Sequence, residues 1–276
     1  MNKPLLYRIL PVLLAAVLVL ASCREKEAPY FVQISDPQLG FINFSEDFSP
    51  EMEIMERMIP QVNGLDADFI VLSGDLVHKR SDSCALEAFK GLLGKFRKDL
   101  KVYCLPGNHD VGNEALPQEV GAFVERYGSD RFVHKEKTYT VIGYNSCVVK
   151  ARTEAEEAEY RWLEEQLKGA DAGNPVIVVA HHPIFLDNPD EPETYETLPV
   201  EMRMKYLQLF EKYGVDVYLA GHLHKCASGE YNGIQLITSS AAGRQLGEQK
   251  SGYSIVKIED GNPVVEYVEM DSSSVQ

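Results

Sequence analysis

The stretch "VYCLPGNHD", Val102 to Asp110, is the part of the sequence that decides the fold. A short apolar run typical of a buried strand ends in a Pro-Gly turn, and Asn108, His109 and Asp110 follow directly. Amide, imidazole and carboxylate groups are side chains that bind metal ions and transfer protons. Their place immediately after a predicted strand indicates a site at the end of that strand.

Other predicted strands end in residues of the same chemistry. They are Tyr30–Ser35 with Asp36 and Gln38, Phe69–Ser73 with Asp75, Pro175–Ala180 with His181 and His182, and Val215–Ala220 with His222 and His224. In open α/β sheets, ligands bind in the crevice beyond the carboxyl ends of the strands. A single Asp after a strand is usually a turn or cap residue, and a single His is usually structural, as we expect for His78 and His134. The place of His78 near Asp75 in the sequence also allows it to face the cleft. Five of the seven histidines, however, fall at three of these strand ends, so packing alone is an improbable explanation.

The strands alternate with segments of helical periodicity. Amphipathic helices are expected near residues 51–63, 84–99, 117–127, 154–168 and 200–213, with a further strand at Tyr139–Tyr144. This alternation predicts a layered α/β fold in one domain over residues 30–270, followed by a disordered tail at 271–276. After Gly221 short strands with Gly-containing turns replace the helices, and we expect these to form hairpins that complete a second sheet.

The set of candidate ligands predicts two metal ions. Carboxylate, amide and imidazole ligands without thiolates suit Mn²⁺, Fe or Zn²⁺. One carboxylate must bridge if the two ions lie ~3.5–4 Å apart, and such a pair activates a bridging water for in-line displacement at phosphorus. A histidine beside the ions can then protonate the leaving alkoxide.

The motifs "SDPQ", "SGDLVH", "PGNHD", "AHHP" and "AGHLHK", spaced from Asp36 to His224, resemble those of the calcineurin-like metallophosphoesterases. The resemblance implies a four-layer αββα sandwich of two mixed β-sheets flanked by helices, with the metal site at the carboxyl ends of the strands. It also implies a hydrolase acting on phosphate esters, in which a hydroxide that bridges two divalent metal ions attacks phosphorus.

The same resemblance assigns roles to single residues. It implies that Asp36, Gln38, Asp75 and His224 surround the first ion, and that Asp75, Asn108, His181 and His222 hold the second, with Asp75 as the bridge. His109 would be the general acid, oriented by Asp110. His182 follows a ligand position and is expected to support a ligand rather than bind metal.

The first motif departs from the usual pattern of this superfamily. Most members have Asp-x-His there, whereas this chain has Asp36-Pro37-Gln38. A glutamine offers only a neutral amide oxygen, which is a harder and generally weaker ligand than imidazole for Zn²⁺ or Fe. We therefore expect a more labile first site that favours Mn²⁺ or Mg²⁺. A branch of the superfamily shares the Asp-Pro-Gln motif.

The N-terminus predicts an exported lipoprotein. Lys3 and Arg8 precede an apolar run, and "LASC" ends at Cys23 in the manner of a bacterial lipobox, so residues 1–22 are expected to be a signal peptide. The alternative is an ordinary secretory signal with Cys23 incidental. Lipidation of Cys23 would anchor the chain to a bacterial cell-envelope membrane through residues 23–29, of which the six residues Arg24–Pro29 reach about 20 Å.

Charge and composition exclude some partners. The chain has a formal net charge of −15, and without Lys3 and Arg8 25 basic residues face 42 acidic ones, a net charge of −17. Such a chain repels phosphate backbones, so we expect no nucleic-acid partner. The acidic, proline-rich segment "LDNPDEPETYETLP", Leu186 to Pro199, is either a functional loop that overhangs the pocket and tunes substrate choice or a solvated insertion.

Two other functions stay open. The first is a serine/threonine phosphatase that acts on proteins rather than on small phosphate esters. The second is a binding lipoprotein that keeps the metals for stability and lacks catalysis. The pair His109-Asp110 argues against the second alternative, because neither residue is needed to hold the metals.

Overall fold

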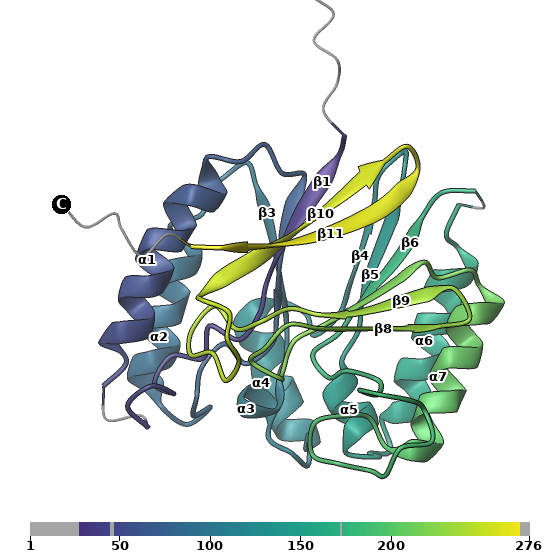
Figure 1. Ribbon diagram of the computed structural model, residues 1–276. Coiled ribbons are helices and arrows are strands. Elements are labelled where there is room, and N and C mark those ends of the chain that lie inside the picture. Colours follow the sequence, from purple (N-terminus) through teal and green to yellow (C-terminus); the bar gives the residue numbers. More distant parts are fainter. Residues whose placement is uncertain (1–27, 45–46, 172, 271–276) are drawn as a thin grey trace, which may run out of the picture.

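The computed structural model describes residues 28–44, 47–171 and 173–270. Two mixed β-sheets pack face to face, and helices cover their outer faces (Figure 1). The helices beside the first sheet are α1 (Ser49–Asn63) and α2 (Ser83–Leu93), and those beside the second are α6 (Glu156–Lys168) and α7 (Val200–Lys212). The predicted four-layer α/β architecture is confirmed.

The first sheet has five strands in the order β11-β10-β1-β2-β3. These strands are β1 (Tyr30–Ile34), β2 (Phe69–Ser73), β3 (Lys101–Leu105), β10 (Gly252–Glu259) and β11 (Asn262–Glu269). Strands β1, β2 and β3 are parallel, and β10 runs antiparallel to β1.

The second sheet has six strands in the order β4-β5-β6-β7-β9-β8. These strands are β4 (Phe132–Lys135), β5 (Thr140–Gly143), β6 (Val176–Val179), β7 (Val217–Ala220), β8 (Ala227–Tyr231) and β9 (Ile234–Thr238). The inner strands β5, β6, β7 and β9 are parallel, and antiparallel strands lie at both edges.

The prediction that both C-terminal hairpins complete the second sheet is wrong for one of them. The hairpin β8–β9 joins β7, whereas β10–β11 joins β1 in the first sheet. The difference follows from burial, because "GYSIVKIE" in β10 is apolar enough to be buried on both faces, while "ASGEY" in β8 is largely exposed and suits an edge.

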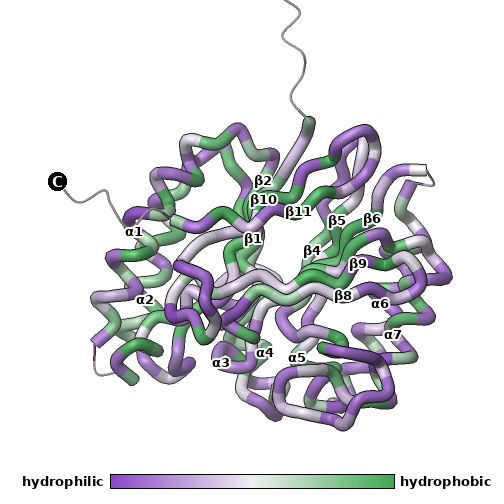
Figure 2. The backbone as a smooth tube through the Cα atoms, in the orientation of Figure 1, coloured by the Kyte–Doolittle hydropathy of each residue, from purple (hydrophilic) through white to green (hydrophobic). Residues whose placement is uncertain are grey.

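The central strands are apolar on both faces because each lies between a sheet and a helical layer. In β1, Phe31 belongs to the core between the sheets, whereas Val32 packs into the core beneath the helices. Phe69 and Ile70 divide in the same way in β2. Figure 2 shows the resulting hydrophobic strands and the more polar outer segments.

Three short features had no counterpart among the predicted elements. They are β4 and the helices α3 (Asn108–Val111) and α5 (Ser146–Lys150). The helix predicted at 117–127 is α4 (Pro117–Tyr127). Helix α2 ends at Leu93, six residues before the predicted end at residue 99, and Gly94 is its C-cap. A single helical turn carries too little periodicity to be recognised from sequence, and β4 lacks the continuous apolar run that marks equally short strands such as β6.

The packing brings the strand ends of the two sheets together. Gln33 in β1 donates from Nε2 to Ser73 Oγ at 3.0 Å and to the Ala220 carbonyl of the second sheet at 3.0 Å. Because β1, β2, β6 and β7 end on the same rim, the residues that follow them share one volume of space.

Several predictions concern residues that lie outside the described part of the chain. They are the signal peptide at 1–22, lipidation at Cys23, most of the tether at 23–29 and the disordered tail at 271–276. These remain predictions, as does the domain boundary at residue 30. Within the described ranges no helix has both the length and the hydropathy needed to cross a membrane.

Candidate metal centre

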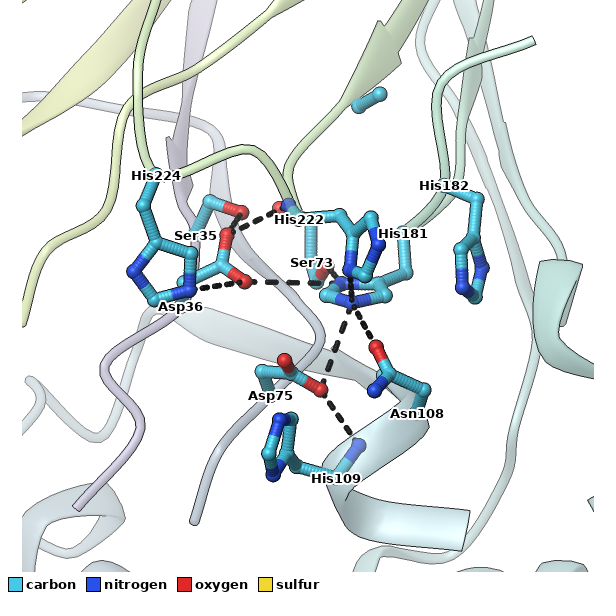
Figure 3. A network of polar contacts seen from close by, with 12 residues as sticks. Ser35, Asp36, Ser73, Asp75, Asn108, His109, His181, His182, His222 and His224 are labelled. Carbon is cyan, nitrogen blue, oxygen red and sulfur yellow. Dashed lines mark hydrogen bonds and ion pairs between the residues drawn. The ribbon is translucent and has the colours of Figure 1, made fainter. Parts of the chain in front are cut away.

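The structure places all nine predicted site residues at the rim where the two sheets meet. They are Asp36, Gln38, Asp75, Asn108, His109, Asp110, His181, His222 and His224. Figure 3 shows most of them converging around Asp36 and Asp75. All nine except the half-buried His109 are at least nine-tenths buried, although their side chains are polar.

Asp36, Asp75 and His224 form the first group of candidate ligands. Each offers an atom that lies within 4.8 Å of the atoms offered by the other two. Asp36 Oδ2 accepts hydrogen bonds from Ser35 Oγ and from the His222 backbone N–H at 2.9 Å, while Oδ1 faces His224 Nε2 at 3.5 Å. This is the predicted first site without its fourth member.

Gln38 is the fourth predicted member of that group and lies in the same loop as Asp36. Its side chain is buried, and its backbone N–H donates to the Asp75 carbonyl at 2.8 Å. Within the described residues, Gln38 Oε1 and Asp36 Oδ1 are buried oxygens that accept no hydrogen bond. A buried acceptor without a donor is costly unless a cation takes that place.

His181 is the centre of the second group. Its Nε2 lies 3.4 Å from Asp75 Oδ1, 3.2 Å from Asn108 Oδ1 and 3.2 Å from His222 Nδ1. His181, His222 and His182 also form a group whose candidate ligand atoms lie within 4.8 Å of one another. The predicted second set, Asp75, Asn108, His181 and His222, is therefore assembled.

Backbone carbonyls fix the tautomer of each ligand histidine. His181 Nδ1 donates to the Ser73 carbonyl at 3.0 Å, His222 Nε2 donates to the Tyr195 carbonyl at 3.4 Å, and His224 Nδ1 donates to the Arg244 carbonyl. When the ring is neutral, its other nitrogen carries a lone pair directed at the cluster. Imidazole lone pairs, carboxylate oxygens and amide oxygens thus face one another, and divalent cations fit that donor set.

Burial and mutual charge shift the protonation of these groups. Burial raises the pKa of Asp36, against the opposing effect of His224 and His181. Burial alone would also raise the pKa of Asp75, but the charge and hydrogen bond of His181 hold that pKa well below its usual range. Burial lowers the pKa of His222 to about 3, so this ring is neutral and free to bind metal.

The loops that carry the ligands have an unusual backbone. Asp36, Gln38, Asp75, His222 and His224 all have positive φ, between 39° and 70°. Residues other than Gly rarely adopt this left-handed backbone conformation, and clusters of such residues mark functional sites. Close packing adds to the constraint, because a Cβ at Gly107 would overlap Asp75 Oδ1 and a Cβ at Gly221 would overlap Ser35 Oγ.

His109 lies beside the cluster and is oriented by a different group from the one we predicted. Its Nδ1 donates to the His78 carbonyl at 2.7 Å, and its ring stacks on the His78 ring at 4.8 Å between centroids. Its backbone N–H donates to Asp75 Oδ1 at 2.8 Å. His109 Nε2 is the ring nitrogen left for chemistry.

The prediction that Asp110 orients His109 is therefore wrong. The Asp110 carboxylate accepts backbone N–H groups from Gly107 at 2.8 Å and from Leu76 at 3.0 and 3.1 Å, with Val77 at 3.4 Å. It ties the loop after β2 to the loop after β3. Burial, with the nearby charge of Asp75, raises the pKa of Asp110 to about 7, although the N–H bonds oppose that shift.

Two further residues contact the centre and were not singled out in the sequence. Ser146 Oγ accepts the backbone N–H groups of His181 at 3.2 Å and His182 at 3.0 Å, and it lies 3.1 Å from His182 Nδ1. Tyr195, from the acidic segment, bonds to Asn108. The only sequence signal for Tyr195 is a lone aromatic residue among acidic residues and prolines.

A comparison with known protein families shows to which family this chain belongs. The calcineurin-like phosphoesterase family matches residues 30–226. The chain belongs to this family. Family membership makes it a metallophosphoesterase, a hydrolase of phosphate esters whose relatives use a dinuclear centre of divalent ions.

Two relatives are similar in sequence to this phosphoesterase over most of its length. It is 30% identical to the serine/threonine-protein phosphatase CPPED1 of Danio rerio over 270 residues, which cover 89% of this chain and 86% of the relative. It is 29% identical to the same protein of Homo sapiens over 266 residues, 89% of this chain and 85% of the relative. The predicted resemblance is confirmed.

Solved structures support the fold of this phosphoesterase. A dimetal phosphatase from Danio rerio superposes with a TM-score of 0.66 at 12% identity, covering 88% of this chain and 96% of that one. A purple acid phosphatase from yellow lupin superposes with a TM-score of 0.64 at 14% identity, covering 90% and 52%. At such identities the likeness concerns the fold.

The first prediction concerns Gln38. Gln38→His should tighten Zn²⁺ binding at the first site by about tenfold, or ~1.4 kcal/mol, because an imidazole nitrogen replaces a neutral amide oxygen. Competition titrations with Zn²⁺ and Mn²⁺ measure the change, with Gln208→His on the exposed face of α7 as the control for an added histidine. Equal stoichiometry and equal metal preference in all three proteins would show that Gln38 is not a ligand.

The second prediction concerns proton release. Burial lowers the pKa of His181, but Asp75 and Asp36 more than compensate and raise it to about 9 in the metal-free protein. Metal uptake at pH 7.5 should therefore release about one proton from this ring, and apparent affinity should rise with pH up to about 9. Calorimetry in two buffers of different ionisation enthalpy gives the proton count, and identical heats in both buffers would contradict it.

Proposed function

We propose that this phosphoesterase hydrolyses phosphate esters with His109 as the general acid. The observation that carries the proposal is the position of His109, whose backbone N–H bonds to Asp75 while its Nδ1 bonds to the His78 carbonyl, which leaves Nε2 for proton transfer. The predicted ligands Asp36, Gln38, Asp75, Asn108, His181, His222 and His224 would hold two divalent ions. When bound, such ions lower the pKa of a coordinated water and neutralise charge on the phosphoryl oxygens.

His109 is built to deliver a proton at one atom. The carbonyl of His78 holds Nδ1–H at 2.7 Å, so only Nε2–H of the imidazolium can be given to a leaving oxygen. Stacking on the His78 ring restricts the imidazole further. After transfer the neutral ring keeps the same hydrogen bond to His78, so its orientation does not depend on its charge.

A cavity beside His109 supplies room for the leaving group. It has a volume of about 610 Å³, and its lining includes Asn108, His109 and Tyr195 together with the charged residues Lys79, Arg126, Glu114 and Glu119. Since the general acid lines this cavity, the alcohol part of the substrate would lie there and the phosphoryl group would lie at the ligands. A polar, mixed-charge lining suits a polar alcohol.

Protein substrates are the second candidate. The relatives that are about 30% identical over most of the chain are named serine/threonine-protein phosphatases, and this likeness favours phosphoserine or phosphothreonine as the leaving alcohol. Fold likeness does not decide between a protein and a small phosphate ester. Comparing a phosphoserine peptide with small alkyl phosphates would separate the two.

The third prediction tests the role of His109. His109→Ala should lower kcat by about 10²–10⁴ for an alkyl phosphate but much less for p-nitrophenyl phosphate, because nitrophenolate leaves without a proton. Steady-state assays with added Mn²⁺ on both substrates and on a phosphodiester measure this, with bound metal determined in parallel.

Asp75→Asn serves as the control for loss of the centre, because Asp75 is the predicted bridge between the ions. Wild-type activity no higher than that of Asp75→Asn on every substrate would reject the enzyme. Equal losses on the alkyl and nitrophenyl esters in His109→Ala would keep the enzyme but reject His109 as the acid.

We also propose that the chain is an exported lipoprotein of a bacterial cell envelope, anchored through Cys23. The sequence supports this with a basic start, an apolar run and "LASC" ending at Cys23. Several acyl chains on one cysteine would hold the domain close to the membrane surface.

The fourth prediction tests that anchor. Cys23→Ser should move the protein from the membrane fraction to the soluble fraction of a bacterial host and should abolish labelling by radioactive palmitate, because the modified thiol is gone. Fractionation and labelling of wild type and variant measure this. A wild-type chain without label would overturn the lipoprotein assignment, and cleavage elsewhere would show an ordinary secretory signal.

A further inference from the structure

Tyr195 contacts two of the residues that would hold the second ion. Its hydroxyl accepts a hydrogen bond from Asn108 Nδ2 at 2.7 Å, and its backbone carbonyl accepts one from His222 Nε2 at 3.4 Å. Its ring also lies against the His222 ring, with centroids 5.0 Å apart. One residue of the acidic segment therefore reaches both an amide ligand and an imidazole ligand.

The hydroxyl of Tyr195 sets which end of the Asn108 amide faces the centre. An amide has a carbonyl oxygen that binds cations and an NH₂ group that repels them. With Nδ2 bonded to Tyr195, the oxygen Oδ1 points to His181 Nε2 at 3.2 Å, where the lone pairs of the second group converge. Rotation of the amide would exchange the acceptor for a donor at the same place.

The segment that carries Tyr195 is held firmly at its base. Arg203 in α7 is completely buried, and its guanidinium donates to the carbonyls of Leu198 at 2.9 Å and Glu191 at 2.6 Å and to Thr197 Oγ1 at 2.9 Å. A buried arginine left without these acceptors would cost several kcal/mol, so the segment and α7 are fixed together.

A second brace comes from the other side. Lys150 Nζ, in α5, donates to the carbonyls of Thr194 at 2.6 Å and Thr197 at 2.5 Å, on either side of Tyr195. Tyr195 is 54% exposed, yet the backbone is anchored one residue before it, at Thr194, and two residues after it, at Thr197. These hydrogen bonds fix the backbone that positions the Tyr195 ring beside the metal centre.

We propose that Tyr195 is a positioning residue that orients the Asn108 amide, oxygen inward, for the second divalent ion. The proposal rests on the proposed function, because it assigns a role within the same metal centre. Tyr195 acts through Asn108 and contacts no ion in this proposal. The acidic segment at 186–199 is then a functional loop, whose braces serve to place one hydroxyl.

The fifth prediction tests the hydroxyl alone. In the full chain, Tyr195→Phe keeps the ring and the carbonyl that bonds His222 but removes the acceptor for Asn108 Nδ2. The affinity for the second ion should fall by about 10–100-fold, the effect typical of lost outer partners of a ligand, while the first ion binds as before. Titration with Co²⁺, followed by its visible absorption and by calorimetry, resolves the two sites.

Tyr213→Phe is the matched control, because it removes a hydroxyl hydrogen bond of 3.1 Å to Glu164 between α6 and the end of α7. It should bind both ions like wild type. In Tyr195→Phe, kcat measured at saturating metal should return to within a few-fold of wild type, since the lost affinity is restored by mass action.

The outcomes separate this proposal from the proposed function. If wild type binds two ions but hydrolyses no ester, the proposed function fails. The ratio of the affinities of wild type and Tyr195→Phe for the second ion still decides the role of Tyr195. If Tyr195→Phe binds both ions as tightly as Tyr213→Phe, the positioning role is overturned although hydrolysis stands. A kcat that stays low at saturating metal with unchanged affinity would overturn it as well.

Discussion

The charge of two buried carboxylates, Asp36 and Asp75, is the constraint on which the rest of the structure depends. A buried charge costs several kcal/mol unless it is paired and hydrogen-bonded. Asp75 Oδ1 takes the backbone N–H of His109 from the first sheet and faces His181 of the second sheet at 3.4 Å. The two sheets are therefore linked through charges that neither sheet neutralises alone. Metal binding would therefore stabilise the packing of the two sheets, since the cations would satisfy the same oxygens.

The fold supplies the rigidity that this arrangement needs. Five predicted ligands have left-handed backbone conformations, and each of these costs on the order of 1–3 kcal/mol. Hydrogen bonds between the loops hold them in place, such as Asp36 N–H to the Gly74 carbonyl at 3.2 Å and Gln38 N–H to the Asp75 carbonyl at 2.8 Å. Asp110 belongs to the same support, because its carboxylate collects N–H groups from two loops. Its place beside His109 in the sequence thus reflects loop geometry rather than proton transfer.

The sequence predicts the strands and their ligands because both have strong local signals. Runs such as Phe69–Ser73 are apolar on both faces, and the ligand residues follow them within a few positions. Contacts between distant loops have no such signal. Tyr195 lies 87 residues from Asn108, and no pattern in either segment announces their hydrogen bond. The partner of the hairpin β10–β11 is hidden for a similar reason, because the local pattern predicts a hairpin but does not show that β1 is the strand it joins.

The acidic surface and the anionic substrate are compatible because charge acts locally at this centre. Although the net charge of the chain is −15, ionic screening limits the reach of exposed charges to about 8 Å at physiological ionic strength. Lys79 and Arg126 line the cavity beside His109, whereas Arg80 is paired with Glu119 at 2.7 Å. Two divalent ions held by the predicted ligands would add four positive charges beside that cavity and make its local field more positive. A single phosphoryl group is then attracted, while an extended polyanion still meets the acidic surface around it, so substrate choice follows from the distance over which each charge acts.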